Sequence, residues 1–203
     1  MRKTLTPSFL NRPTVRVARE LLGKYVVRRY RGRETALMIT EVEAYDGLGD
    51  LASHAAQSKN ARTGRAAIMF GPAGYWYVYF TYGMHWLANI VTGSKDYPAA
   101  ILIRAGEYHD PKTGETARII GPARLTKFLK IDRMQNGKPA MRTTGLWLED
   151  RGNKIPSARI VATKRVGVDY AGPIWSAKEY NFKIGPERST ISRSAVSRKG
   201  YRS

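Results

Sequence analysis

The run from Tyr75 to Tyr82 constrains the fold most, because almost every residue in it is aromatic or β-branched and so favours an extended strand. Comparable runs that favour strands are Tyr25 to Tyr30, Thr35 to Tyr45, His85 to Val91 and Ala99 to Glu107. Gly32 and Gly83 interrupt neighbouring runs as hairpin turns do. The sequence therefore predicts a mostly antiparallel sheet, with shorter strands at Leu146 to Glu149, Ala158 to Thr163 and Tyr180 to Ile184.

Two segments have the features of helices. Val15 to Leu22 has helical spacing and stops at Gly23, a residue that suits a helix end. Gly121 to Leu129 begins with a glycine and a proline, as helices often do. Gly47 to Ala61 reads as a loop with a short helix near Leu51 to Ala56. Strands and separate helices together predict an α+β fold.

The composition predicts one globular domain. The chain has 203 residues, 42% of them hydrophobic, which is enough for one core, and we assign residues 1–188 to it and 189–203 to a basic, flexible tail. The absence of cysteine excludes disulfides and suggests an intracellular protein, in the cytoplasm or nucleoid of a prokaryote or the nucleus of a eukaryote. No apolar run approaches the length of a membrane span, so no membrane partner is expected.

The chain is strongly basic. It contains 35 Lys and Arg against 16 Asp and Glu, a net charge of +19. The basic residues are spread through Arg28 to Arg33, Lys59 to Arg65 and Lys127 to Arg133, which suits a folded surface that follows phosphates. A general excess of basic residues, as in ribosome-associated proteins, is the alternative explanation.

The strand from Thr35 to Tyr45 carries two carboxylates. Strict alternation predicts one face with Leu37, Ile39, Glu41, Glu43 and Tyr45, and the other with Met38, Thr40, Val42 and Ala44. Glu41 and Glu43 then form either an acid-and-base pair or two ordinary exposed strand residues.

Other chemistries lack their motifs. The histidines His54, His85 and His109 do not have metal-site spacing, so no metal ion is expected. No serine occupies a Gly-x-Ser-x-Gly motif, and Gly71 to Gly74 lacks the lysine of a phosphate-binding loop. At least half of the residues in the Tyr75 to Tyr82 run should pack in the core, which leaves two or three tyrosines free to stack on bases.

These residues resemble the alkyladenine (3-methyladenine) DNA glycosylase family of base-excision repair. The matching blocks, in the family's order from about Thr14 to Phe182, are Thr40 to Tyr45, His54, Tyr77 to Met84 with Asn89, Leu102 to Ala105, Gly121 to Leu125, and Arg165 to Val168. Several of these blocks are individually unusual. The resemblance implies a single domain with a curved sheet and flanking helices, similar to the C-terminal domain of methionyl-tRNA formyltransferase.

The resemblance also implies an activity, which is hydrolysis of the N-glycosidic bond of alkylated or deaminated purines in double-stranded DNA. This class of lesion includes 3-methyladenine, 7-methylguanine, hypoxanthine and ethenoadenine. Glu43 would activate the attacking water, which Arg104 and the carbonyl of Val166 would help to hold. The enzyme would act as a monomer, by base flipping, without metal or organic cofactor.

The other site residues follow in the same way. Those that would line the base pocket are Tyr45, His54, Tyr79 and Asn89. Asn89 would exclude guanine, because it would clash with the exocyclic amino group of that base. Those that would contact DNA are Tyr82, which would fill the gap left by the flipped base, together with Met84 and His85. His85 occupies a position where members of that family often have tyrosine.

Two rival functions remain open from the sequence. A non-catalytic DNA- or RNA-binding module could use the same basic, tyrosine-rich surface. A bifunctional glycosylase and lyase would need a lysine at the sugar, whereas the family resembled here uses water.

Overall fold

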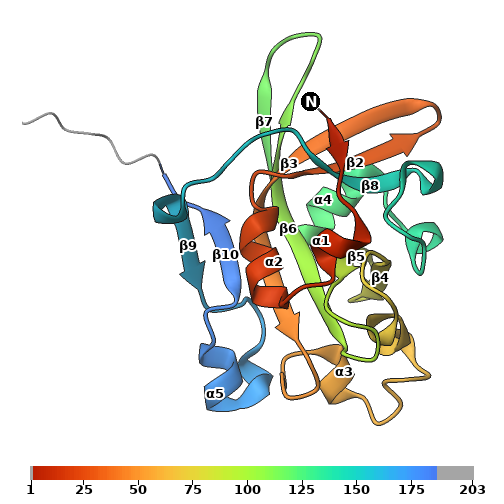
Figure 1. The fold of residues 1–203 in the computed structure, drawn as a ribbon, viewed down its shortest axis with the longest axis vertical. Coiled ribbons are helices and arrows are strands. Elements are labelled where there is room, and N and C mark those ends of the chain that lie inside the picture. Colours follow the sequence, from red (N-terminus) through yellow and green to blue (C-terminus); the bar gives the residue numbers. More distant parts are fainter. Residues whose placement is uncertain (1, 187–203) are drawn as a thin grey trace, which may run out of the picture.

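A computed structural model describes residues 2–186 as one α+β unit built on a strongly curled sheet (Figure 1). The tail predicted at residues 189–203 lies outside the described residues. All of the strand pairings recorded for the described residues are antiparallel, so the predicted sheet type is confirmed.

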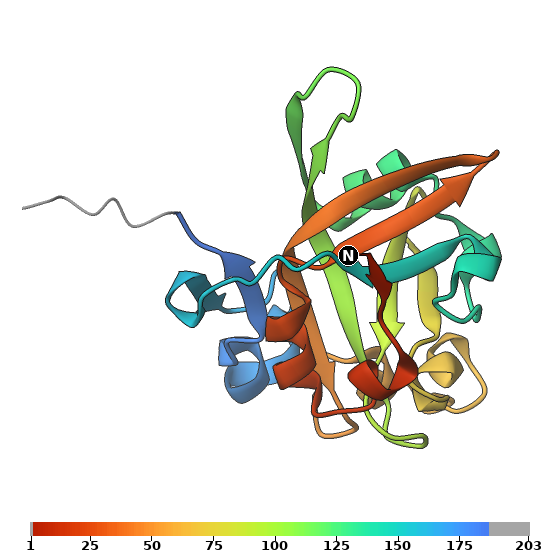
Figure 2. The same cartoon turned by 45° about the horizontal axis from the view of Figure 1, so that its top comes forward.

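The strands follow one another across the sheet in an order that places β3 near its centre. In spatial order they are β1 (Lys3–Thr4), β8 (Leu146–Asp150), β2 (Tyr25–Tyr30), β3 (Arg33–Asp46), β6 (Ala99–His109), β5 (His85–Val91) and β4 (Trp76–Thr81). Off this path, β7 (Thr116–Ile120) pairs with β6, while β10 (Asn181–Ile184) pairs with both β3 and β9 (Ile160–Thr163). Figure 2 shows the sheet curling so that β3 and β6 run through the middle of the molecule. The second half of β3 thus lies between β6 and β10.

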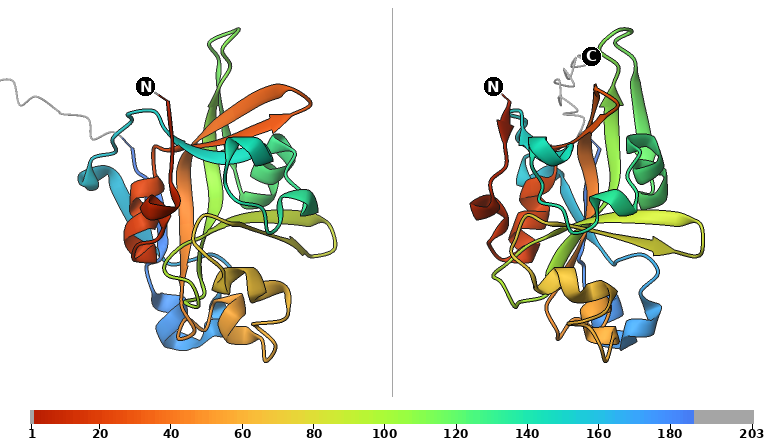
Figure 3. Two further views of the ribbon diagram at one scale, coloured as in Figure 1. Left: turned by 45° about the vertical axis from the view of Figure 1, so that its right-hand side comes forward. Right: turned by 90° about the vertical axis from the view of Figure 1, so that its right-hand side faces the viewer.

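Helices cover the sheet on different sides. The helices are α1 (Pro7–Leu10), α2 (Thr14–Leu21), α3 (His54–Gln57), α4 (Pro122–Leu129) and α5 (Gly172–Ala177). The buried residues of α2, such as Val17 and Leu21, pack on the central core, and so do Leu125 and Leu129 of α4. Figure 3 shows α2 and α4 on opposite sides of the central strands. None of the helices in residues 2–186 is long and apolar enough to cross a membrane.

The ends of the two predicted helices have clear causes. Gly23 directly follows α2's C-cap residue with φ of +81°, a conformation that glycine adopts without steric cost. Gly121, with φ of +101°, caps the start of α4, and Pro122 occupies the first turn, where its missing N–H costs nothing. Both helices therefore lie within one residue of their predicted ends at these glycines.

The strict alternation predicted for β3 is wrong at Thr40. The register between β3 and β6 shifts between Ile39 and Glu41 and again between Glu41 and Val42. These irregularities turn the strand, so that Leu37 and Ile39 share the central core with Val42 and Ala44 rather than with the carboxylates. Glu43 and Tyr45 follow both shifts and still lie together, as predicted, and Glu41, which lies between the two shifts, is joined to Glu43 through Arg104.

Several elements were absent from the sequence prediction. These are α1, α5, β1, β7 and the 3₁₀ helices, among them η1 (Arg65–Phe70). The short helix expected near Leu51 to Ala56 is α3, which begins at His54 after Ser53 accepts a hydrogen bond from the Ala55 amide. Two of the missed regions matter most for function, because η1 and the segment that precedes α5 border the site.

Candidate active site

Glu43 is a buried carboxylate held by four hydrogen bonds. It lies in β3, opposite Leu102 of β6 and Asn181 of β10, and its exposed fraction is 0%. Oε1 accepts from the Val166 amide at 2.8 Å and from Asn181 Nδ2 at 3.2 Å. Oε2 accepts from the Tyr45 hydroxyl at 3.0 Å and from Arg104 Nη1 at 3.1 Å. A buried charge needs such partners, and here they also fix the carboxylate's position.

Glu41 belongs to the same network. Arg104 bridges the two carboxylates, because its Nε donates to Glu41 Oε1 at 3.0 Å. Asn181 also bridges them, with Nδ2 at 2.8 Å from Glu41 Oε1. Glu41 is therefore not an ordinary exposed strand residue. Its carboxylate accepts hydrogen bonds from Arg104 and Asn181 and holds them in place, so it is not a free partner to Glu43 in an acid-and-base pair.

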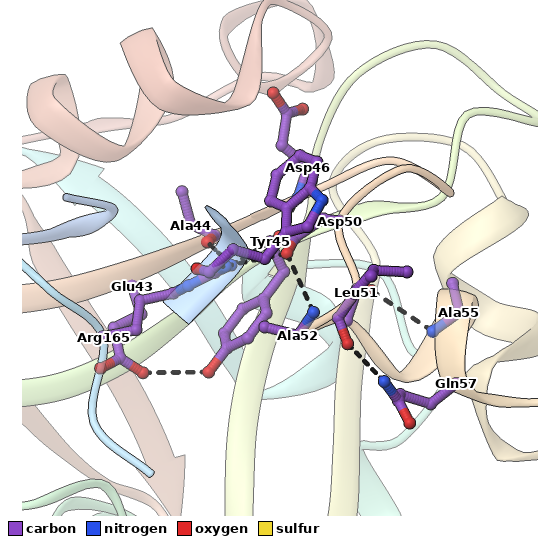
Figure 4. A network of polar contacts seen from close by, with 12 residues as sticks. Glu43, Ala44, Tyr45, Asp46, Asp50, Leu51, Ala52, Ala55, Gln57 and Arg165 are labelled. Atoms are coloured by element: carbon purple, nitrogen blue, oxygen red, sulfur yellow. Dashed lines mark hydrogen bonds and ion pairs between the residues drawn. The ribbon is translucent and has the colours of Figure 1, made fainter. Parts of the chain in front are cut away.

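Behind Tyr45 lies a fully buried ion pair (Figure 4). Asp50 and Arg165 have side chains that are 0% exposed, with Arg165 Nη2 at 2.8 Å from Asp50 Oδ1 and Nη1 bound to Oδ2. Burial lowers the pKa of Arg165, but the hydrogen bonds and charge of Asp50 outweigh that effect and raise it. The guanidinium lies 4.9 Å from the Tyr45 ring centroid and also donates to the Ala44 carbonyl. Because Arg165 precedes Val166, this pair fixes the amide that contacts Glu43.

A cavity of about 590 Å³ opens in front of this network. Its walls come from β3, α3, η1, the β4–β5 hairpin, β6, the start of α4 and the segment from Val166 to Tyr170. Tyr45, Arg104 and Val166 line it, whereas Glu43 lies directly behind them. Both donors to Glu43 Oε2 line the cavity, whereas of the two donors to Oε1 only Val166 lines it and Asn181 does not.

One wall of the cavity is aromatic. His54 Nδ1 lies 2.8 Å from the Tyr77 hydroxyl, and its ring meets the Tyr79 ring edge-on at 4.6 Å between centroids. Burial, with a smaller contribution from Arg65, lowers the pKa of His54 to about 4. Burial likewise raises the pKa of Tyr79 to about 12, so both rings are neutral near pH 7. This wall offers flat, uncharged faces that suit a purine.

Asn89 lies in the floor of the same cavity. It is 3% exposed, and its Nδ2 donates to the Tyr77 carbonyl at 3.1 Å across the β4–β5 pair. That bond keeps the amide from swinging aside.

The turn between β4 and β5 projects into solvent. Tyr82 is 85% exposed and Met84 68%, and His85 is also exposed. Tyr82 has φ of +50°, a left-handed conformation that is rare for a residue other than glycine and that suggests a functional constraint. Tyr82 and His85 line the mouth of the cavity.

The structure brings nearly all of the predicted site residues to one cavity. Those that line it are Tyr45, His54, Tyr79, Tyr82, His85, Asn89, Arg104 and Val166, with Glu43 directly behind. Met84 lies in the exposed turn and does not line it. The Val166 group seen at Glu43 is the amide, and the predicted role of its carbonyl stays a prediction.

Sequence reasoning missed Arg65, Tyr77, Tyr170, Asn181 and the Asp50 to Arg165 pair. Tyr77 and Arg165 stand inside the matching blocks, so their proximity to site residues was the available signal. Asn181 depends on the pairing of β10 with β3, which no local pattern indicates.

The structure offers no cluster that suits a metal ion within residues 2–186, where no three His, Cys, Asp or Glu side chains converge suitably. The expectation of a cofactor-free site stays a prediction.

Comparison with known proteins agrees with this geometry. The family described as Methylpurine-DNA glycosylase (MPG) matches residues 8–187. A protein of Anaeromyxobacter sp. (strain Fw109-5), named "Putative 3-methyladenine DNA glycosylase", is 44% identical over 89% of this chain and 88% of its own. A protein of the same name from Methanocella arvoryzae is 42% identical over 83% of this chain and 86% of its own. Another of that name, from Desulfitobacterium hafniense, is 36% identical over 92% of this chain and 97% of its own. The chain therefore belongs to the methylpurine-DNA glycosylase family and is a DNA glycosylase that acts on alkylated bases.

Proposed function

We propose that the protein is a monofunctional purine DNA glycosylase that flips alkylated or deaminated purines out of double-stranded DNA and hydrolyses the N-glycosidic bond with a water activated by Glu43. The observation that carries this proposal is the position of Glu43, which is buried behind an aromatic cavity and held by three groups that line it. The substrates would be bases of the 3-methyladenine, 7-methylguanine, hypoxanthine and ethenoadenine class. The enzyme would act as a monomer.

Glu43 Oε2 would accept the proton of the attacking water. The Val166 amide and Asn181 anchor Oε1, whereas both partners of Oε2, Tyr45 and Arg104, are side chains that line the cavity. Rotation of the Tyr45 hydroxyl would free an Oε2 lone pair for the water without moving the carboxylate. The water oxygen would bond to the anomeric carbon, the bond to the base would break, and its electron pair would leave with the base. The negative charge of Glu43 would also oppose the positive charge that develops on the sugar.

The cavity would receive the flipped base. Its volume of about 590 Å³ is within the range of small-molecule sites, and the rings of Tyr45, His54 and Tyr79 supply stacking surfaces. Asn89, fixed by its bond to the Tyr77 carbonyl, would stand where a guanine amino group would have to fit. Normal guanine would thereby be disfavoured by contact. 7-Methylguanine carries the same amino group, so its excision would depend on the weaker glycosidic bond that its positive charge produces.

The exposed turn would open the duplex. A side chain that is 85% exposed on a tight turn can enter the base stack and occupy the space left by a flipped nucleotide, so Tyr82 would act as the wedge. Met84 and His85 beside it would contact the neighbouring backbone or bases. The net charge of +19 supports attraction to the phosphates.

The test is the product. Purified protein should release free base from duplexes that contain 3-methyladenine, 7-methylguanine, hypoxanthine or ethenoadenine, and leave an intact abasic strand. Borohydride should trap no covalent complex. Binding to such duplexes without base release would contradict the proposal, and trapping would show that a lysine rather than water attacks the sugar.

A further inference from the structure

Arg65 is a charged residue of the cavity wall to which the mechanism above gives no role. It begins the 3₁₀ helix η1 and lines the cavity, and its guanidinium carbon lies 5.8 Å from the ring centroid of Tyr79. Tyr79 is one of the rings proposed to stack on the base. A molecule bound against this aromatic wall would therefore lie close to the guanidinium.

Arg65 differs from the other arginines of the site because no carboxylate neutralises it. Arg104 is paired with Glu41 and Glu43, and Arg165 with Asp50. Within residues 2–186, Arg65 forms no ion pair and donates no hydrogen bond; its recorded contact is with the Tyr79 ring. Its charge is therefore available to a bound molecule.

The charge balance of the cavity depends on this residue. The network behind the cavity holds three carboxylates, Glu41, Glu43 and Asp50, against two guanidinium groups, Arg104 and Arg165. Without Arg65, one net negative charge would remain and would attract a cationic base. Arg65, an exposed residue whose guanidinium lies over the Tyr79 ring, offsets this charge at the aromatic wall.

The field of Arg65 reaches the interior of the pocket. After burial, the charge of Arg65 is the second cause that lowers the pKa of His54, to about 4. It also acts on the hydroxyls of Tyr77 and Tyr79, in the direction that lowers their pKa against the larger raising effect of burial. A charge that disfavours an imidazolium at this wall disfavours any other cation there, including a methylated purine.

We infer that Arg65 is a specificity-determining residue that selects against cationic alkylated purines and in favour of neutral damaged purines. The inference rests on the proposed function, because it requires the damaged base to occupy this cavity. A base that carries a fixed positive charge would meet Arg65 on entering, whereas a neutral base such as hypoxanthine would meet no repulsion and could use the guanidinium as a hydrogen-bond donor to its carbonyl oxygen.

The neighbouring arginine provides a matched control. Arg62 lies in the same turn, but it pairs with Asp96 at 2.9 Å, lies over the Phe70 ring and does not line the cavity. Arg62→Gln removes a charge of equal size from a side chain that does not line the cavity. Arg65→Lys keeps the charge and removes the planar guanidinium.

The experiment measures single-turnover base release from methylated duplex containing 3-methyladenine, which is cationic, and from duplex containing hypoxanthine, which is neutral. The ratio of the two rates should rise on the order of 10-fold in Arg65→Gln, since one nearby, partly solvated charge is lost. The ratio should stay near the wild-type value in Arg62→Gln and Arg65→Lys. Thermal unfolding of each variant establishes that it is folded at the assay temperature.

The outcomes separate the inference from the function on which it rests. If Arg65→Gln slows or accelerates both substrates by the same factor, Arg65 contacts phosphate or shapes the loop, and the inference is overturned. A ratio that falls also overturns it. If the wild-type protein releases neither base, the proposed function itself fails.

Discussion

Replacement of Asp50 by Asn tests whether the buried ion pair holds the active site together. Asp50 accepts from Arg165 Nη1 and Nη2 and from the amides of Asp46 and Ala52. The substitution keeps the shape but leaves the guanidinium of Arg165 buried without a counter-charge. Breaking such a pair costs about 3 to 5 kcal/mol. At about 2 to 4 °C per kcal/mol for a chain of this size, the midpoint of thermal unfolding should fall by roughly 6 to 20 °C.

Asp96→Asn is the control, because it breaks an arginine to aspartate pair whose side chains are 62% and 61% exposed. That variant should lose no more than about 1 kcal/mol. Calorimetry on both variants at one pH, with chemical denaturation as a second measure, gives the comparison. The coupling is read by repeating Asp50→Asn in an Arg165→Met background, where its cost should shrink. Equal midpoints for Asp50→Asn and Asp96→Asn would refute the account of the pair.

Two further predictions concern His54 and Tyr82. The folded state lowers the pKa of His54 from its usual 6.5 to about 4, so the unfolded state binds more protons between these two pH values. The free energy of unfolding should therefore fall by up to about 3 kcal/mol as pH drops from about 6.5 to 4. In His54→Asn this part of the pH dependence of unfolding should disappear, and a profile identical to that of the wild type would show that folding does not shift the pKa of His54. Tyr82→Ala should slow release of well-paired hypoxanthine about 10-fold or more while release from a mismatched lesion changes less, and equal losses would contradict the wedge assignment.

Much of the site was predictable because short motifs place chemistry at fixed intervals on a strand. Glu43 and Tyr45 lie two residues apart after the register shift, so alternation alone brings them to one face. The exposed turn at Tyr82 was predictable from the glycine that follows it. The family resemblance then predicted that His54 and Asn89 lie in the same site as Tyr45, although they are far from it in the chain.

What was not predictable depends on pairings between distant segments. The irregular register at Thr40 lets both halves of β3 pair with β6 while Leu37 and Ile39 share one core with Val42 and Ala44. Alternation within β3 alone does not predict such a shift. Asn181 reaches Glu43 through the β10 to β3 pairing, although the two residues are 138 positions apart in the chain. Arg65 reads as part of an ordinary basic turn until η1 places it against Tyr79. In each case the deciding contact is tertiary.

The structure changes how a substitution at Glu43 must be read. Gln at this position would turn an amide toward either Val166 and Asn181 or Tyr45 and Arg104, and all four are donors. A buried donor left facing a donor costs about 1 to 3 kcal/mol, so part of any loss of activity could come from lost stability. Unfolding and DNA binding must therefore be measured beside the rate.

The most direct test of the central claim is the single-turnover rate of base release by Glu43→Gln, compared with Glu41→Gln, for protein shown to be folded and bound to a lesion-containing duplex. Glu43→Gln should lower the rate at least 10²- to 10⁴-fold, the usual loss for a general base, while binding survives. Glu41→Gln should cost much less, because Glu41 acts by holding Arg104 and Asn181. A normal rate in Glu43→Gln together with loss of activity in Glu41→Gln would contradict the account of this active site.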